Sequence, residues 1–204
     1  AMGGLMRITG ERDDLPGGGP QKAGIAIADV MTGMYATIAI LSALEHRSVS
    51  GRGQYIDMAL LDCIVALGGN QVTGYFASGK VPGRFGNAHA SLVPYQVFVV
   101  ADGEIVVAVG NDGQWQQYCA AIERSDLGAD PRWTKVTGRI TGRDELVPEL
   151  ARTMLTRTRA EWLERLESRG VPCGPINNYR EVFEDAQVQH RKLRVDLQRP
   201  DGSI

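Results

Sequence analysis

The sequence predicts a chain of two parts, an α/β segment followed by a small α+β domain. Apolar residues recur at helical spacing over 28–46 and again over 60–78. A run with three glycines and a proline, 79–89, then interrupts this pattern. Past that run, two short strand patterns and several amphipathic helices follow. We therefore divide the chain into 1–78, the end of a larger domain, a linker or glycine-rich loop over 79–89, and a small α+β domain over 90–204.

The first part is predicted to be mostly helical after an opening loop. Residues 1–24 are rich in glycine and punctuated by proline, which favours loops. A helix is expected over 28–46, and Gly51 is a natural terminator because glycine adopts the left-handed conformation that ends many helices. A short strand is expected over Tyr55–Leu60, where the residues alternate in character, and a second helix over 60–78.

The second part is predicted to combine a hairpin with amphipathic helices. Val93–Val100 and Glu104–Gly110 are two apolar runs joined by the turn Ala101–Gly103, an arrangement typical of a β-hairpin. Val171–Pro175 is expected to be a rigid loop, because its two prolines fix the backbone. The remaining expected elements are helices over 112–123, 143–155, 159–169 and 179–186, and a strand over 193–199.

The composition is that of a soluble globular protein. Of the 204 residues, 43% are hydrophobic and 23% are charged, so an apolar core can form. The formal net charge is −2, and the basic residues are scattered along the chain. Because nucleic-acid binding depends on a basic surface, we expect no nucleic-acid partner.

The cysteines and the longest apolar run bear on where the protein works. Cys63, Cys119 and Cys173 are few and far apart, which argues against a disulfide framework and favours the reducing cytoplasm. The apolar run Ile25–Leu44 contains Asp29 and several polar residues, so we expect it to belong to a soluble protein and not to span a membrane.

Asp29 is the first candidate for chemistry. It follows four apolar or small residues and stands at the predicted start of a helix. The N-terminus of a helix carries unpaired N–H groups and a partial positive charge, both of which stabilise an anion. A structural alternative is that Asp29 is only the N-cap of the helix, a position that aspartate favours. Pattern alone favours the cap.

Two glycine-containing segments are further candidates. Gly86, Asn87, Ala88 and His89 precede a predicted strand, where small residues allow a backbone to approach a ligand and His89 offers a hydrogen bond or a proton. The alternative there is an interdomain turn with a solvent-facing histidine. Gly51–Gln54 resembles a phosphate loop only loosely, and we interpret it as a tight helix-to-strand connection. No cluster has metal-ligand spacing, so no metal is expected.

Taken in order, many segments closely resemble the class III CoA-transferase family, also called the CaiB/BaiF family. The resemblance covers nearly the whole chain, and its most distinctive blocks are Ser50–Gln54 and Gly170–Pro175. The matching segments are Gly4–Met6, Thr9–Gly10, Ala28–Asp29, Thr32–Tyr35, Ala43–Leu44, Ser50–Asp57, Leu60–Asp62, Gly86–His89, Pro94–Phe98, Asp102–Gly103, Val109–Asp112 and Gly170–Ile176.

The resemblance implies an activity and a role for Asp29. In the family, the aspartate at this position is the nucleophile that attacks an acyl-CoA thioester, giving a mixed anhydride and then an aspartyl-CoA thioester. A free carboxylic acid then takes the CoA. This double transfer keeps the thioester energy throughout. The substrates are an acyl-CoA and a carboxylic acid, and no tightly bound cofactor is implied. The family's glycine-rich loop, which covers the site, maps onto the segment from Gly86 to Ala90.

The resemblance also implies an architecture and a branch of the family. Members have a Rossmann-like large domain and a small α+β domain, and two chains interlock as a homodimer. The matching segments lack the N-terminal part that holds most of the CoA site, so the CoA-binding residues are unknown, and they lack a C-terminal part as well. At Ala88–Ser91 this chain departs from the glycine run of the formyl-CoA branch. Its His89 form is more similar to the dicarboxylate branch, such as succinyl-CoA:glutarate transferases.

Two alternatives remain open at this point. The first is an α-methylacyl-CoA racemase of the same family, in which the aspartate moves a proton together with a histidine about 30 residues earlier. That histidine would precede residue 1. The second alternative is a non-catalytic fragment or assembly subunit, whose apolar helix over Met31–Leu44 needs a partner.

Overall fold

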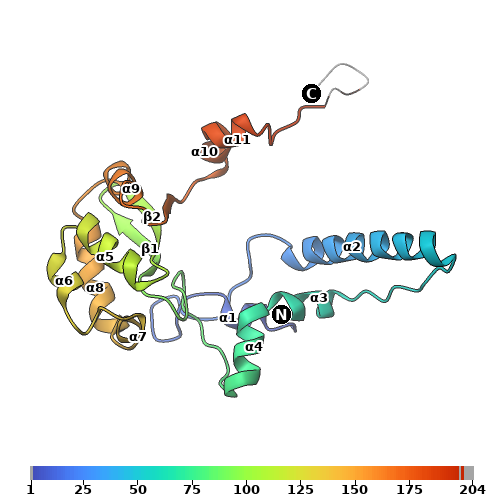
Figure 1. The fold of residues 1–204 in the computed structure, drawn as a ribbon, viewed down its shortest axis with the longest axis horizontal. Coiled ribbons are helices and arrows are strands. Elements are labelled where there is room, and N and C mark those ends of the chain that lie inside the picture. Colours follow the sequence, from blue (N-terminus) through green and yellow to red (C-terminus); the bar gives the residue numbers. More distant parts are fainter. Residues whose placement is uncertain (1, 198, 200–204) are drawn as a thin grey trace. The chain divides into compact units, whose positions relative to one another are not determined.

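The computed structural model describes residues 2–197 and 199 (Figure 1). It is a mixed structure of helices and one small antiparallel sheet, and it divides into two compact units, Ala1–Ala90 and Ser91–Ile204.

The sheet of the second unit has three antiparallel strands in the order β1-β2-β3. The strands are β1 (Tyr95–Val100), β2 (Gly103–Ala108) and β3 (Cys173–Pro175). Phe98 lies opposite Ile105 in the register, and both are buried. Because side chains alternate between the two faces of a strand, the face of the sheet that carries this pair is covered by the core. The predicted hairpin is therefore confirmed.

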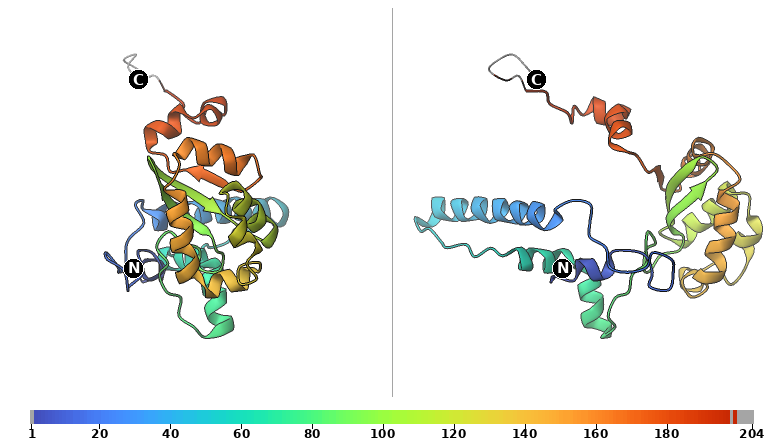
Figure 2. Two further views of the ribbon diagram at one scale, coloured as in Figure 1. Left: turned by 90° about the vertical axis from the view of Figure 1, so that its left-hand side faces the viewer. Right: turned by 180° about the vertical axis from the view of Figure 1, so that it is seen from behind.

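Helices cover this face and complete the core. Two views show α5 to α8 gathered on one side of the sheet (Figures 1 and 2), while α8 packs on β1 and α9 packs on β2 and β3. Leu146, Leu150 and Met154 recur at four-residue steps in α8 and are all buried in the core. The helices of this unit are α5 (Asp112–Ala121), α6 (Ser125–Ala129), α7 (Val136–Thr141), α8 (Arg143–Met154), α9 (Arg159–Glu167), α10 (Tyr179–Glu184) and α11 (Ala186–His190).

A fully buried arginine lies inside this core. The Arg139 guanidinium donates hydrogen bonds to the backbone oxygens of Val93, at 2.8 Å, and Trp133, at 2.9 Å. It also donates to Oδ1 of Asp112 at 3.1 Å and lies over the Trp115 ring. A buried charge is tolerated only where it is paired and hydrogen-bonded, and these four contacts meet that requirement.

The first unit contains four helices among the residues that the structure describes. They are α1 (Leu5–Ile8), α2 (Ile27–Ser50), α3 (Leu60–Leu67) and α4 (Gly69–Ser78). α2 packs along α3, and α3 contacts α4. Gly51 ends α2 in the left-handed conformation, with φ of 71°, and its N–H donates to the backbone oxygen of Arg47 at 2.9 Å. The expected terminator is confirmed.

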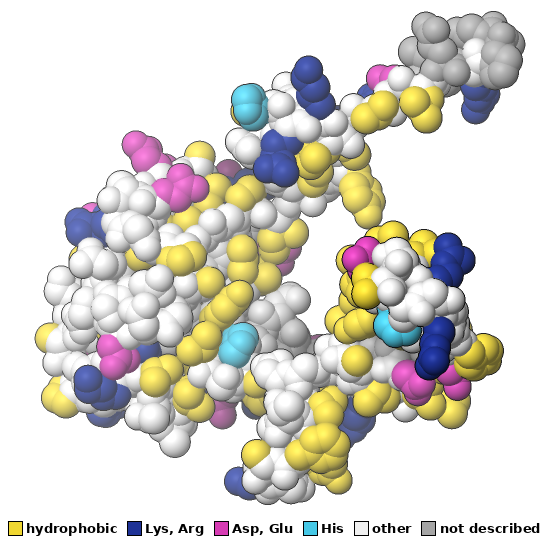
Figure 3. All heavy atoms as spheres, turned by 45° about the vertical axis from the view of Figure 1, so that its right-hand side comes forward, with side chains coloured by type: hydrophobic (Ala, Val, Ile, Leu, Met, Phe, Trp, Pro, Cys, Tyr) yellow, Lys and Arg dark blue, Asp and Glu magenta, His cyan; other side chains and the backbone are white. Residues whose placement is uncertain are grey.

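Few side chains of the first unit are buried. Of its described residues, the buried ones are Cys63, Ile64 and Arg84. None lies on α2, and apolar side chains of this unit are open to view in Figure 3. By length and composition alone α2 could cross a membrane, a test that core helices of soluble proteins and signal sequences also pass. The expectation that the protein has no membrane partner stays a prediction.

Two predictions for the first unit were wrong in detail. Tyr55–Leu60 is not a strand: residues 52–59 have no regular structure, and Leu60 already belongs to α3. A strand needs a neighbour for its backbone hydrogen bonds, and the sheet among the described residues lies in the other unit. The helix expected over 60–78 is two helices, because Gly69, with φ of 46°, breaks it. The helix over 28–46 extends four residues further, to Ser50.

The second unit also differs from expectation in places. The loop expected at Val171–Pro175 contains β3, which pairs with β2, so its residues gain backbone partners that the sequence pattern did not reveal. Short α6 and α7 were missed, as were α1 and α11, since helices of four to six residues carry little periodicity. The strand expected over 193–199 is absent: residues 193–197 and 199 have no regular structure, and residue 198 lies outside the described residues.

The ion pair between Asp112 and Arg139 predicts a pH dependence of stability. Desolvation, the largest single influence, raises the pKa of Asp112. The hydrogen bond and charge of Arg139, the N–H of Val136 and the charge of Lys135 together lower it more, so the pKa lies below its usual value. A lowered pKa in the folded state stabilises the fold above the unfolded value of about 4, and this stability is lost as the pH falls through the folded pKa. In urea unfolding, Asp112→Asn should therefore have a lower free energy of unfolding than the wild type at pH 7. This difference should become smaller at pH 3.

The control for this prediction is Glu164→Gln, which neutralises an exposed carboxyl group on α9. Its difference from the wild type should be small at both pH values. A deficit of Asp112→Asn that is the same at pH 7 and pH 3 would contradict the assignment, because it would show that the charge of Asp112 contributes nothing.

Candidate active site

Asp29 lies in the first turn of α2, but it is not the cap of that helix. The N-cap is Ala26, and no side chain bonds the free N–H groups there. Asp29 is the third helical residue, and its own backbone N–H donates to the oxygen of Ala26 at 3.1 Å. The helix starts earlier than the sequence predicts because the chain turns tightly at Ile25, whose oxygen accepts from the N–H of Ile27 at 2.9 Å. The N-cap alternative is therefore wrong.

The Asp29 side chain is exposed and has no structural partner in view. Among the described residues, no hydrogen bond or ion pair joins its carboxylate to another group. The positive end of the α2 dipole nevertheless favours a negative charge at this position. Asp29 is thus an accessible carboxylate in the first turn of a helix, and its side chain takes no part in packing.

A groove of about 350 Å³ runs beside the segment that leads to Asp29. Its walls are mostly apolar, and Lys22 is the one charged residue among those that line it. No ion pair of the Lys22 ammonium is recorded among the described residues. Sequence reasoning missed this residue, although a lone cation just ahead of the apolar segment that leads to Asp29 was a usable signal. The lining residues are Leu5, Met6, Lys22–Ala28 and Ile64.

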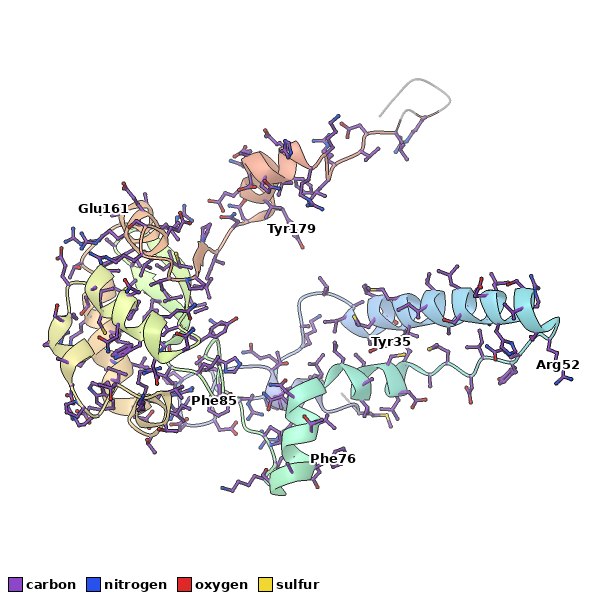
Figure 4. All side chains as sticks on the ribbon, viewed as in Figure 1. Tyr35, Arg52, Phe76, Phe85, Glu161 and Tyr179 are labelled. Atoms are coloured by element: carbon purple, nitrogen blue, oxygen red, sulfur yellow. The ribbon has the colours of Figure 1, made fainter. Side chains whose placement is uncertain are left out.

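The other predicted site residues lie on a tight turn of the same unit. Gly86 and Asn87 are exposed, whereas Ala88 and His89 are half-buried. The turn is closed by a hydrogen bond from the N–H of Ala88 to the oxygen of Phe85, the residue labelled in Figure 4, at 2.9 Å. Neither Asp29 nor Gly86 to His89 is among the residues that line this groove, which reaches Ala28, the residue before Asp29. The structure does not bring the two predicted halves of the site into one pocket.

The two halves are nevertheless tied to one turn of the chain. Gln21, which directly precedes the groove-lining segment, donates its N–H to the oxygen of Thr9 at 2.9 Å. Gly86 donates its N–H to the oxygen of the next residue, Gly10, at 3.1 Å. The approach to Asp29 and the start of the Gly86–His89 loop are therefore fixed to neighbouring carbonyl groups.

Other candidate chemistry finds little support. A second cavity of about 250 Å³ is almost wholly apolar and is lined by parts of α1, α3 and α4, with Val81 and Pro82, and no Asp, Glu, Ser, Thr, Cys or His is among its lining residues. Gly51–Gln54 is an exposed connection after α2. Within residues 2–197 and 199, no group of three or more His, Cys, Asp or Glu side chains could hold a metal ion. The three cysteines are free.

The chain belongs to CoA-transferase family III, since the model of that family matches residues 1–204. It is 43% identical to the succinate–glutarate CoA-transferase of Agrobacterium fabrum over all of this chain and 50% of that protein. It is 38% identical to the succinyl-CoA:mesaconate CoA-transferase of Haloarcula hispanica, over 98% of this chain and 49% of that protein. The chain thus spans about half the length of these curated relatives.

Solved structures agree with this placement. A CAIB/BAIF family protein from Brucella suis superposes with a TM-score of 0.79 and 42% identity, over 96% of this chain and 50% of that one. Rv3272 from Mycobacterium tuberculosis superposes with a TM-score of 0.78 and 26% identity, over 93% of this chain and 48% of that one. The family resemblance expected from the sequence is confirmed.

The geometry of Asp29 predicts a small effect of its removal on stability. Because the side chain caps nothing, Asp29→Ala should lower the free energy of unfolding only by the helix-dipole contribution, less than about 1 kcal/mol. Asn111 is a suitable comparison, since its side chain does cap α5 by accepting from the N–H of Gln114 at 2.8 Å. Asn111→Ala should cost about 1 kcal/mol or more in the same urea-unfolding experiment. A larger loss for Asp29→Ala than for Asn111→Ala would show a structural role for Asp29.

Proposed function

We propose that the native protein that carries this chain transfers CoA between an acyl-CoA and a free carboxylic acid, with Asp29 as the nucleophile. The observation that carries the proposal is an accessible carboxylate at the positive end of α2, unused by the fold, in a chain of CoA-transferase family III. Both conditions favour a nucleophile: the side chain is accessible, and no described group occupies its lone pairs.

The chemistry follows from a carboxylate nucleophile. An oxygen of Asp29 attacks the thioester carbonyl, the C–S bond breaks, and a mixed anhydride forms with release of the CoA thiolate. The thiolate attacks the aspartyl carbonyl, which frees the first acid and leaves an aspartyl-CoA thioester. The second acid attacks this thioester, and the thiolate then attacks the carbonyl of the incoming acyl group. The products are a new acyl-CoA and the regenerated Asp29 carboxylate, so each step conserves an activated acyl bond.

The substrates proposed are dicarboxylic acids and their CoA thioesters. The relatives reported above are named for succinate, glutarate and mesaconate. A dicarboxylic acyl group carries a negative charge at the end remote from its thioester. The groove before Asp29 offers apolar walls for the carbon chain and the Lys22 ammonium for that charge. We therefore assign Lys22 as the partner of the remote carboxylate.

The Gly86–His89 loop is proposed as a cover for the same reaction. Its exposed glycine and asparagine and its half-buried histidine offer backbone and side-chain donors to a bound acyl-CoA. The residues that hold most of the CoA are unknown. On the proposed division, 1–78 is the end of the large CoA-binding domain, 79–89 the loop, and 90–204 the small domain.

The proposed setting is a cytoplasmic homodimer of interlocked chains. The unburied apolar surface of α2 supports such an assembly, because an apolar helix gains stability when another surface covers it. Three free cysteines suit a reducing compartment. No tightly bound cofactor, metal, nucleic acid or membrane is part of the proposal.

Experiments can still distinguish this proposal from two other functions, a racemase and a non-catalytic role. The relatives named above are CoA-transferases, which favours transfer over the racemase alternative. A non-catalytic role would apply if the native protein neither bound CoA nor turned over acyl-CoA.

A trapping experiment tests the proposed role of Asp29. The native protein is incubated with succinyl-CoA and no acceptor, treated with hydroxylamine, and digested for mass spectrometry. An activated aspartyl group reacts with hydroxylamine, so a hydroxamate should appear on the peptide that contains Asp29. Asp29→Asn should lose both the adduct and CoA transfer. Glu45→Gln, which alters an exposed acid on the same helix, should keep both.

The alternatives predict different results in this trapping experiment. Exchange of deuterium at the α-carbon of an acyl-CoA, with no adduct and no transfer, would favour the racemase. Transfer that persists in Asp29→Asn would contradict the nucleophile assignment.

A second prediction concerns substrate class. Lys22→Met should raise the KM for glutarate by about 10- to 100-fold, the equivalent of one hydrogen bond to a charged group. The KM for butyrate, which has no remote carboxylate, should stay the same, and Lys22→Arg should retain most of the preference for the diacid. Equal losses for the diacid and the monoacid in steady-state assays would show that Lys22 does not recognise the remote carboxylate.

A further inference from the structure

The side chain of Arg84 is buried against the chain's first turn. Only 2% of it is exposed, although it lies next to a glycine-rich loop with little packing around it. Its Nη1 donates to the backbone oxygen of Arg7 at 2.9 Å, and its Nε donates to the oxygen of Glu11 at 3.3 Å. Its Nη2 forms an ion pair with Asp13. One guanidinium therefore binds three points of the turn 7–13.

The same turn accepts backbone hydrogen bonds from two other segments. The N–H groups of Gly19 and Gln21 donate to the oxygens of Glu11 and Thr9, at 3.4 Å and 2.9 Å. The N–H of Gly86 donates to the oxygen of Gly10 at 3.1 Å. The turn thus joins the segment that enters the groove before Asp29 to the segment that starts the Gly86–His89 loop.

Gly86 is pressed closely against this turn. Its φ of 58° lies in the left-handed region, and a Cβ atom built on it would lie 2.6 and 2.7 Å from the two carboxylate oxygens of Glu11. A side chain at position 86 would require the Glu11 carboxylate to move, and the left-handed backbone would strain it. The start of the loop is therefore seated on the turn by a backbone hydrogen bond on one side of Phe85 and by the Arg84 side chain on the other.

We infer that Arg84 is a positioning residue for the reaction. It holds the Gly86–His89 loop and the approach to Asp29 on one turn, and so fixes the loop relative to the nucleophile. The inference rests on the proposed function, since it is the transfer reaction that needs this geometry. Arg84 touches neither Asp29 nor the groove residues in its recorded contacts, so its effect is indirect. Displacing a positioned group by about 1 Å can cost about 100-fold in rate.

The guanidinium suits this role better than an ammonium would. A planar group with five N–H donors can satisfy two carbonyl oxygens and a carboxylate at once, whereas lysine offers a single nitrogen. Arg84→Lys should retain the pairing with Asp13 but lose part of the grip on the carbonyl oxygens. Arg84→Met should lose all three contacts while filling a similar volume. The two variants therefore form a graded series.

Hydrogen exchange in the native protein tests whether Arg84 holds the loop on the turn 7–13. This measurement does not depend on enzymatic activity. In Arg84→Met, the amide of Gly86 should exchange at least about tenfold faster, because local opening then costs less free energy. Arg84→Lys should lie between Arg84→Met and the wild type. Amides of β1 and β2 should keep their wild-type rates. If the amides of those strands also exchange faster, the substitution has destabilised the whole protein, and the proposed local role of Arg84 is wrong.

Rates of adduct formation test the positioning role itself. Per folded molecule, Arg84→Met should form the hydroxylamine-trapped Asp29 adduct at least about tenfold more slowly, and Arg84→Lys should recover part of the rate. Arg139→Lys is the matched control, since it alters a second buried arginine whose recorded contacts all lie in the second unit. It should lower stability but leave the adduct rate per folded molecule unchanged.

The two proposals fail in different ways. If the wild-type protein forms no adduct at Asp29, the proposed function fails, and the positioning role fails with it, whatever hydrogen exchange shows. If the wild type forms the adduct and Arg84→Met forms it at the wild-type rate per folded molecule, the positioning role alone is overturned.

Discussion

The backbone oxygens of residues 7–13 hold together the parts of the first unit that carry the candidate site residues. This unit has little core, since the buried residues among those described are Cys63, Ile64 and Arg84. Hydrogen bonds to the turn 7–13 hold these segments together, whereas apolar packing holds the second unit together. They come from the Arg84 side chain and from backbone N–H groups of Gln21 and Gly86. The arrangement leaves Asp29 exposed on α2 and keeps its approach and the loop attached to one support.

The second unit is built on the opposite principle. Its sheet and helices enclose a continuous apolar core, and its buried arginine, Arg139, lies within that core and bonds to Val93 and Trp133. In both units a buried guanidinium binds backbone oxygens and one carboxylate, because an arginine is buried at low cost only when its donors are used. Arg139 fastens an already packed core, whereas Arg84 fastens segments that have little other packing.

The sequence allowed the long elements to be predicted and failed where partners decide the structure. The helices near 28–46 and 143–155 and the hairpin carry clear periodicity and were found. Tyr55–Leu60 has the alternation of a strand but no neighbouring strand, and Cys173–Pro175 joins a sheet because β2 lies beside it. For the site, pattern alone favoured a helix cap for Asp29, and only the family resemblance made it a candidate nucleophile. Arg84 gave no signal, because its importance comes from carbonyl groups more than seventy residues earlier.

The central claim is that the acyl group passes through a covalent bond to Asp29, and oxygen-18 labelling tests it most directly. When a labelled acid attacks the aspartyl-CoA thioester and the thiolate then takes its acyl group, one labelled oxygen stays on the aspartate. After a single turnover with labelled glutarate, the peptide that contains Asp29 should therefore hold one oxygen-18 atom. Transfer of CoA to glutarate with no label in that peptide would contradict the account.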